Sequence, residues 1–214
     1  MTKTKIIHII TYIIDNISYV SEIGGITMPA KKKVPKNIIL QAALDIVREK
    51  GIEAVNARSI AQKLRCSTQP IYLSFKGMNE LKVEVFQMID TEYNSFFTKH
   101  IDTKNYLVSV AKSHILFALE EKNLYKAMFL SNIMDGVSLE DVANAVWNKS
   151  TVLSVVKDFQ IDELSAKKLF VQMWLFSSGL AVQLATNNMK VDENDIDLLL
   201  NDFYERLGKS YATE

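Results

Sequence analysis

A short stretch of the chain, RCSTQPIYLSF at residues 65–75, combines hydrogen-bonding side chains with apolar ones. The side-chain amide of Gln69 can form a pair of hydrogen bonds, as glutamine does when it reads the edge of adenine in DNA. Pro70 and Leu73 offer apolar surface of the kind that contacts a thymine methyl group. The stretch therefore either reads base edges or is a turn that happens to contain a proline.

The proline is compatible with a helix because the first N–H groups of a helix have no partner within it. We expect Ser67 to cap this helix and the next three residues to form its first turn. Ile71 and Phe75 then fall on one side and are expected in the core. The opposite side is expected to hold Gln69, Tyr72, Leu73 and Lys76.

Two more helices are predicted before this one. Apolar residues recur at helical period over residues 37–50, and Gly51 suits the end of that helix. Asn56 is expected to cap a second helix over residues 57–64. Two helices joined by a short turn form a helix-turn-helix pattern, but many ordinary helix pairs share this spacing. Spacing alone leaves the choice open.

The charges of the chain are unevenly distributed although they sum to zero. Residues 28–82 contain eleven basic and four acidic side chains, a net charge of +7, and residues 83–214 contain twelve basic and nineteen acidic ones, a net charge of −7. A small basic segment attached to an acidic body is typical of proteins that bind a polyanion such as nucleic acid. A solvated basic face is the alternative.

Residues 36–82 resemble, without a gap, the DNA-binding domain of tetracycline-repressor-type (TetR/AcrR) regulators. The matching segments are ILQAALDIVREKG, ARSIAQKLRCS and IYLSFKGMNEL. Three positions depart from the family pattern: Arg65 replaces the usual turn glycine, Cys66 replaces a valine, and Met78 replaces a lysine that generally contacts phosphate. Lys76 or Lys82 is a candidate replacement for that contact.

The resemblance implies that residues 65–75 enter the major groove of double-stranded DNA. Ser67, Thr68 and Tyr72 are then expected near the backbone, with the hydroxyl groups of Thr68 and Tyr72 on phosphates, and Arg58 on guanine or phosphate. A core position with a wet edge is the alternative for Tyr72. The predicted DNA-binding residues are Lys33, Lys36, Arg58, Ser67, Thr68, Gln69, Pro70, Tyr72, Leu73 and Lys76. Lys31–Lys33 and Lys36 are expected to form a flexible arm, with a solvated tail as the alternative.

The rest of the chain is predicted to be helical, over residues 79–101, 105–123, 124–134, 138–159, 162–188 and 192–208. Asn79 and Ser138 are expected to cap two of these helices, and Gly208 is expected to end the last one. Similar regulators bind a small molecule in this body and dimerise through their last two long helices, here about 163–188 and 193–210. The resemblance thus implies a homodimer, an operator with two half-sites, and an apolar or aromatic effector. The segment WLFSSG resembles a Trp-x-x-x-His-Gly signature, with Ser178 in place of histidine.

Candidate effector-binding residues are the aromatic, methionine and polar side chains Phe117, Met128, Phe129, Met134, Trp147, Phe170, Met173, Trp174 and Ser178. Each of them is equally compatible with an ordinary place in the core, because aromatic and methionine side chains at helical spacing fill cores in many proteins.

We expect an all-α protein with three regions: an extension at 1–30, a helix-turn-helix domain at 31–82, and a regulatory and dimerisation domain at 83–214. Gly24-Gly25 precede Met28, which we expect to be the natural start. A docked extra helix or strand is the alternative for the extension.

The sequence predicts no enzyme, metal site or cofactor. His8, His100 and His114 form no metal-binding or catalytic spacing, and Cys66 is alone. His114 is expected to be a satisfied core residue, and no membrane span is expected. The single cysteine favours a reducing, cytoplasmic setting. The main alternative to a transcription regulator is a helical ligand carrier or interaction protein that no longer reads DNA.

Overall fold

The computed structural model describes residues 34–131, 136–187 and 189–212, and this part of the chain is helical without a strand. The predicted all-α class is therefore confirmed. Residues 34–214 form one compact unit. The N-terminal extension, the lysines at 31–33 and Met134 lie outside the described residues.

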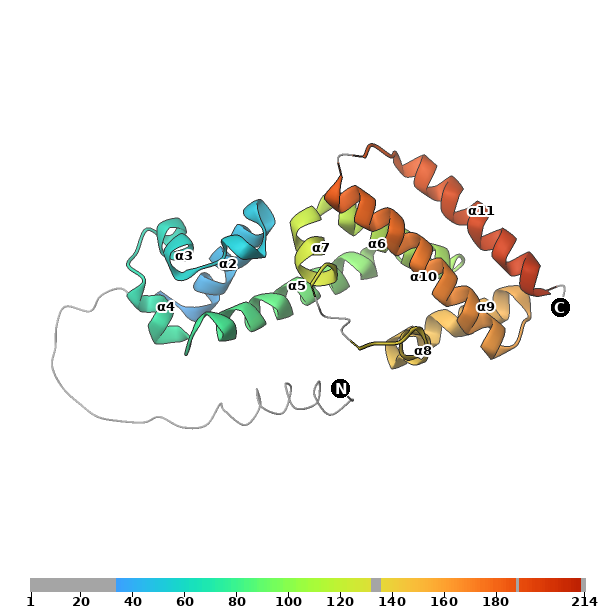
Figure 1. Cartoon of the computed structure of the whole chain (residues 1–214), viewed down its shortest axis with the longest axis horizontal. Helices are drawn as coiled ribbons and strands as arrows, with labels where there is room; N and C mark the ends of the chain where they lie inside the picture. Colours follow the sequence, from blue (N-terminus) through green and yellow to red (C-terminus); the bar gives the residue numbers. More distant parts are fainter. Residues whose placement is uncertain (1–33, 132–135, 188, 213–214) are drawn as a thin grey trace. The chain divides into compact units, whose positions relative to one another are not determined.

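Four short elements precede a long helix (Figure 1). They are α2 (Lys36–Lys50), the 3-10 turn η1 (Ile52–Ala54), α3 (Ala57–Leu64) and α4 (Gln69–Ser74). The long helix α5 (Met78–His100) leads from this group to the body, so it continues without a break through the domain boundary predicted at residue 82.

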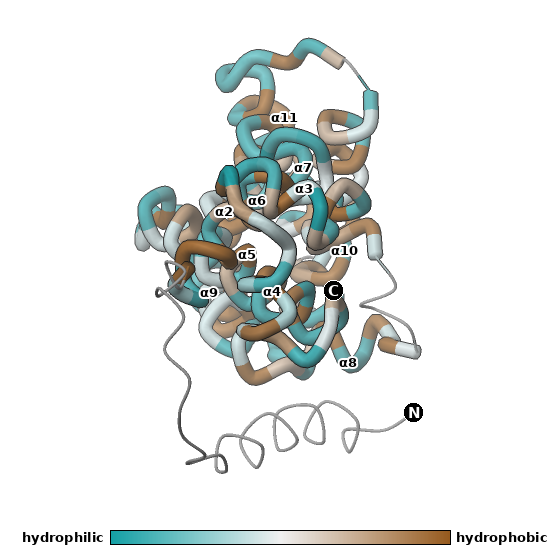
Figure 2. The backbone as a smooth tube through the Cα atoms, turned by 90° about the vertical axis from the view of Figure 1, so that its left-hand side faces the viewer, coloured by the Kyte–Doolittle hydropathy of each residue, from teal (hydrophilic) through white to brown (hydrophobic). Residues whose placement is uncertain are grey.

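The body consists of the remaining elements. These are α6 (Tyr106–Glu120), α7 (Lys122–Phe129), α8 (Leu139–Asn144), η3 (Val146–Asn148), α9 (Lys149–Phe159), α10 (Glu163–Thr186) and α11 (Glu193–Ala212). Helix α6 packs most extensively on α10, and α7 contacts both α2 and α5. Figure 2 shows hydrophobic and hydrophilic residues alternating along the helices, the pattern expected for helices that each bury one face.

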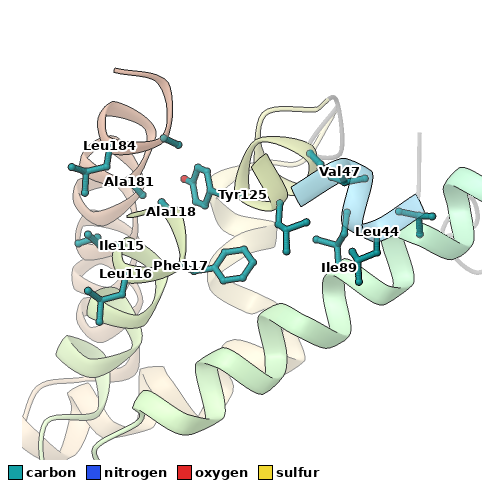
Figure 3. Close-up of a cluster of buried hydrophobic side chains, with 14 of the residues drawn as sticks. Leu44, Val47, Ile89, Ile115, Leu116, Phe117, Ala118, Tyr125, Ala181 and Leu184 are labelled. Carbon is teal, nitrogen blue, oxygen red and sulfur yellow. The ribbon is translucent and has the colours of Figure 1, made fainter. Parts of the chain in front are cut away.

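One hydrophobic core connects the α2–α4 group with the body. Leu44 and Val47 of α2 and Ile89 of α5 are fully buried at one end of the cluster in Figure 3. Phe117 and Tyr125 lie between these residues and the α6–α10 contact. Apolar burial contributes about 25 cal/mol per Å², so this shared core stabilises the packing of the α2–α4 group against the body.

Several helix ends follow the predicted chemistry. The side chain of Asn56 accepts hydrogen bonds from the backbone N–H groups of Arg58 (3.1 Å) and Ser59 (3.0 Å), which confirms the predicted cap of α3. Gly51 ends α2 with φ +86°, a value that favours glycine, and its N–H donates to the carbonyl of Val47. Ser138 caps α8 in a capping box with Asp141.

Other predicted helix ends are wrong. Ser67 is not the cap of α4: Thr68 precedes the helix, has helical dihedral angles and makes no side-chain cap bond. Helix α5 begins after Gly77 and not at Asn79. The single helix predicted at 138–159 is broken at Ala145, whose extended backbone separates α8 from η3 and α9.

The predicted end of helix α11 at Gly208 is also wrong, because the helix continues to Ala212. Gly208 is buried inside the helix, and a Cβ atom there would collide with the ring of Phe159 at the end of α9. Phe159 in turn packs edge-on against Tyr204, with ring centroids 4.9 Å apart. The glycine therefore provides room for an aromatic side chain and does not terminate the helix.

By length and composition, α10 is the one described helix that could cross a membrane. Its buried residues, including Leu169, Met173 and Ala181, pack into the core shared with α6. The core covers one face of α10, and 39% of its most apolar stretch is buried.

Candidate nucleic-acid interface

Helix α4 presents two different faces. Ile71 and Phe75 are 1% and 3% exposed and belong to the core. Tyr72 and Leu73, between them in sequence, are 61% and 73% exposed. The predicted division of this helix is therefore confirmed for these four residues, and the alternative that Tyr72 is a core residue is wrong.

The polar residues of this segment are also accessible. Ser67, Gln69 and Lys76 are exposed, and Thr68 and Pro70 are half-buried at the start of α4. Pro70 occupies the first turn, where its missing N–H breaks no helical hydrogen bond. The hydrogen bond from the N–H of Phe75 to the carbonyl of Ile71 (3.0 Å) closes the helix. Seven of the ten predicted DNA-binding residues, Tyr72 and Leu73 included, thus lie on or beside α4.

Arg58 lies at the start of α3, where the Asn56 cap fixes its backbone and leaves the side chain exposed. Arg65 ends the same helix with a left-handed backbone, φ 52° and ψ 45°. Its N–H bonds to carbonyls of the last turn, and the following Cys66 N–H bonds to the carbonyl of Ala61 (3.0 Å). Within the described part of the chain, neither arginine is in an ion pair.

Two other cationic side chains, Lys36 and Lys63, are paired with carboxylates. Lys36 Nζ lies 2.6 Å from a carboxylate oxygen of Glu84 and 4.9 Å from the ring centre of Phe75. Lys63 Nζ lies 2.6 Å from Glu49. The hydrogen bond to Glu49 raises the pKa of Lys63, so this side chain stays charged but paired. Arg58, Arg65 and Lys76 are exposed and Lys82 is half-buried, and none of the four is in an ion pair among the described residues.

Arg48 links α2 to the body, a role that the sequence did not reveal. Its Nε lies 3.1 and 3.0 Å from the two carboxylate oxygens of Glu121, and its Nη2 lies 3.2 Å from Glu92. The carbonyl of Arg48 accepts a hydrogen bond from the amide of Asn123 (3.0 Å). Because Glu121 and Asn123 lie at the start of α7, and Glu92 lies on α5, one arginine joins α2 to both helices.

The predicted effector residues do not gather in one place. Phe117 and Phe129 both contact the ring of Tyr93, with centroids 5.1 and 5.2 Å apart. Phe170 and Met173 are buried on α10, and Met128, Trp174 and Ser178 are half-buried. Trp147 is 80% exposed on η3, so the structure places it at the surface, outside both a core and an enclosed pocket.

A polar cluster missed by the sequence reasoning lies among these aromatic rings. His114 on α6 is buried, with Nδ1 3.3 Å from the hydroxyl of Tyr93 on α5 and Nε2 3.2 Å from the hydroxyl of Tyr125 on α7. The prediction that His114 is a satisfied core residue is confirmed. Burial lowers the pKa of His114 to about 4 and raises the pKa of Tyr125 to about 12, so all three groups are neutral at pH 7.

Two cavities of the described structure lie elsewhere. One, of about 170 Å³, lies between η3, α9 and the start of α10, and is lined by residues that include Val146, Val152 and Lys167. The other, a wider surface hollow of about 600 Å³, includes Tyr106 and Lys157. Neither is lined by a predicted effector residue. The described residues also contain no group of three or more metal-ligating side chains.

The left-handed Arg65 allows a test that separates stability from binding. A side chain in this conformation costs about 1 kcal/mol relative to glycine, so Arg65→Gly is expected to stabilise the fold by about that amount. If Arg65 contacts phosphate, the same change weakens binding to all duplexes and lowers the salt slope by about one. Urea unfolding and fluorescence anisotropy measure the two effects.

Gln160, which ends α9 with φ 55°, provides the matched control. Gln160→Gly is expected to stabilise the protein similarly but to leave DNA binding unchanged, because its side chain lies in the body. Equal DNA affinity of the Arg65→Gly variant and the wild type would contradict a phosphate contact by Arg65.

No protein-family model matches this sequence, and it has no significant match among curated proteins. A functional assignment therefore depends on the geometry of the candidate interface, its charges and its contacts with the body.

Proposed function

We propose that the chain is a DNA-binding transcription regulator of the tetracycline-repressor type, acting as a homodimer on a palindromic operator in the cytoplasm. The observation that carries the proposal is the division of α4. Its buried residues hold the helix rigidly, while Gln69, Tyr72 and Leu73 project into solvent without a partner in the described structure. A helix of this kind fits the major groove, whose width admits one helix.

The electrostatics support a nucleic-acid partner. Arg58 and Arg65 lie on or directly after α3, Lys76 follows α4, all three are exposed, and α4 itself carries no charged side chain. Basic groups at the edge of a helix suit phosphate contacts, and neutral groups on it suit base edges. The strained backbone of Arg65 also favours function over structure at this position, since glycine would be less costly there.

An apolar surface on the last two helices supports the homodimer. Leu164 and Leu175 of α10 are 64% and 47% exposed, and Leu198 and Leu199 of α11 are 70% and 47% exposed. A helix as apolar as α10 is usually covered on every side. Association of two copies through α10 and α11 would remove these side chains from water and present two α4 helices to one duplex.

Helix α7 supports regulation by an effector. One of its residues, Tyr125, bonds to His114 in the aromatic cluster, while Glu121 and Asn123 at its start bind Arg48 of α2. A small apolar or aromatic molecule that displaced α7 would therefore disturb the contact with α2. Such a change would shift the two α4 helices away from the spacing of the half-sites and release DNA, as in a repressor.

Selection of duplexes from a random pool, followed by titration of the enriched sequence and a scrambled one, tests the proposal. We expect the enriched sequence to be palindromic, and to bind tighter than the scrambled one by at least the thousandfold typical of specific binding. The affinity should fall steeply with salt. Equal binding of both duplexes would reject an operator-reading function and favour the ligand carrier or interaction protein.

A further inference from the structure

We propose that α4 reads A·T base pairs at the centre of each half-site, with Gln69 on an adenine and Leu73 on the methyl group of a thymine. This inference rests on the proposed function and specifies the class of operator. It excludes guanine from the base pairs that α4 covers.

The first step is the chemistry that α4 presents. Its sequence, QPIYLS, contains no charged residue, and its accessible side chains are an amide, a phenol and a leucine. In the major groove, guanine is most often read by arginine or lysine, which donate to its O6 and N7 atoms. Adenine is read by a glutamine or asparagine amide, and the thymine methyl group by apolar contact. The side chains of α4 thus fit adenine and thymine.

The second step is the position of the two readers. Gln69 and Leu73 are four residues apart, so they lie on the same face of α4 about 6 Å apart along its axis. Successive base pairs are about 3.4 Å apart, so these side chains would meet base pairs about two steps apart. At 73% exposure, Leu73 has no apolar neighbour that would keep it from such a contact.

The third step is the position of the cations. Lys63, on α3, is paired with Glu49 and Asp45, and Lys36, on α2, with Glu84, so neither lies on α4. Arg58 and Arg65 lie on or after α3, and Lys76 follows the end of α4. None of the three lies on α4 itself, which assigns them to phosphates or to a base pair at the edge of the half-site.

Selection from a random pool distinguishes failure of this inference from failure of the proposed function. If no sequence is enriched, the proposed function itself fails. If the enriched half-sites have G·C pairs at their centre, DNA reading stands and the A·T inference is overturned. We expect enriched half-sites whose central pairs are A·T.

A second experiment examines the methyl contact in the enriched duplex. Replacing each central thymine in turn with uracil removes only the methyl group. At the contacted thymine this should lower the affinity of the wild-type protein about fourfold. The Leu73→Ala variant should bind the two duplexes equally. Equal binding by the wild type at every position, or an unchanged uracil penalty in Leu73→Ala, would overturn the assignment of Leu73.

The Gln69→Ala variant tests the proposed contact with adenine. It should reduce the preference for the central A·T pair by about 5- to 150-fold, the range expected for one bidentate contact. Lys76→Ala is the control, since loss of a phosphate contact should weaken all duplexes similarly and leave the base preference intact. A Gln69→Ala variant that keeps the wild-type base preference would overturn the role of Gln69.

Discussion

Replacing Ile71 with alanine is expected to lower the free energy of unfolding by about 2–5 kcal/mol, whereas Leu73→Ala is expected to change it by less than about 0.5 kcal/mol. The two residues are two positions apart on the same short helix, but Ile71 is 1% exposed and Leu73 is 73% exposed. Truncating Ile71 leaves a cavity between α4 and α2, while truncating Leu73 removes atoms that contact only solvent. The same loss of apolar side chain therefore has very different costs.

Urea unfolding followed by circular dichroism measures both changes. Under the proposed function, DNA binding gives the opposite ranking: Leu73→Ala folds normally but loses the preference for thymine over uracil, and Ile71→Ala, where still folded, keeps it. Since α4 has only six residues, it depends on Ile71 and Phe75 for its position. Comparable destabilisation by both substitutions would mean that the two faces of α4 are assigned incorrectly.

The elements that the sequence predicted well are those with a local signal. Asn56 and Ser138 cap helices because their side chains reach backbone N–H groups two or three residues away, and Gly51 adopts a positive φ that glycine tolerates. The helical period of the apolar residues is also a local signal, and it correctly placed Ile71 and Phe75 in the core. Where the determining contact was distant, the prediction was wrong. Gly208 has the sequence context of a helix end, but its role depends on Phe159, far away in the chain.

The candidate site divides in the same way. The exposed face of α4 could be predicted from spacing, because one helix determines which residues lie on it. The pairing of Lys36 with Glu84 and the contacts of Arg48 with Glu92 and Glu121 could not, because their partners are more than forty residues away. Trp147 was expected among the aromatic residues of the body, but the break at Ala145 turns η3 outward and exposes it.

The buried His114 makes stability depend on pH, and its surroundings determine the sign. Tyr93 and Tyr125 each bring a hydroxyl group to one ring nitrogen, and Phe129 lies edge-on to the ring. A neutral imidazole has one donor and one acceptor, so one tyrosine accepts a hydrogen bond and the other donates. Protonation would add a charge to this apolar site, and burial therefore lowers the pKa of His114 from 6.5 to about 4.

We expect this histidine to cost the protein about 2 kcal/mol of stability between pH 7.5 and pH 5. The unfolded chain takes up a proton below pH 6.5, whereas the folded protein does so only near pH 4. Stability is therefore fully present above about pH 6.5 and is lost as the pH falls towards 4. Urea unfolding of the wild type and of His114→Gln at several pH values measures the effect.

Comparison with the His114→Gln variant isolates the histidine from the carboxylates. Hydrogen bonds with Ser165 lower the pKa of Asp162, and the hydrogen bond with Lys167 lowers that of Glu163, so these groups lose stability mainly below pH 4.5 and do so in both proteins. The variant is expected to be less stable at pH 7.5, because glutamine fills the site less well, but to lose less stability on acidification. Parallel stability profiles from pH 7.5 to pH 5 would show that His114 can be protonated without unfolding, and that the cluster is open to water.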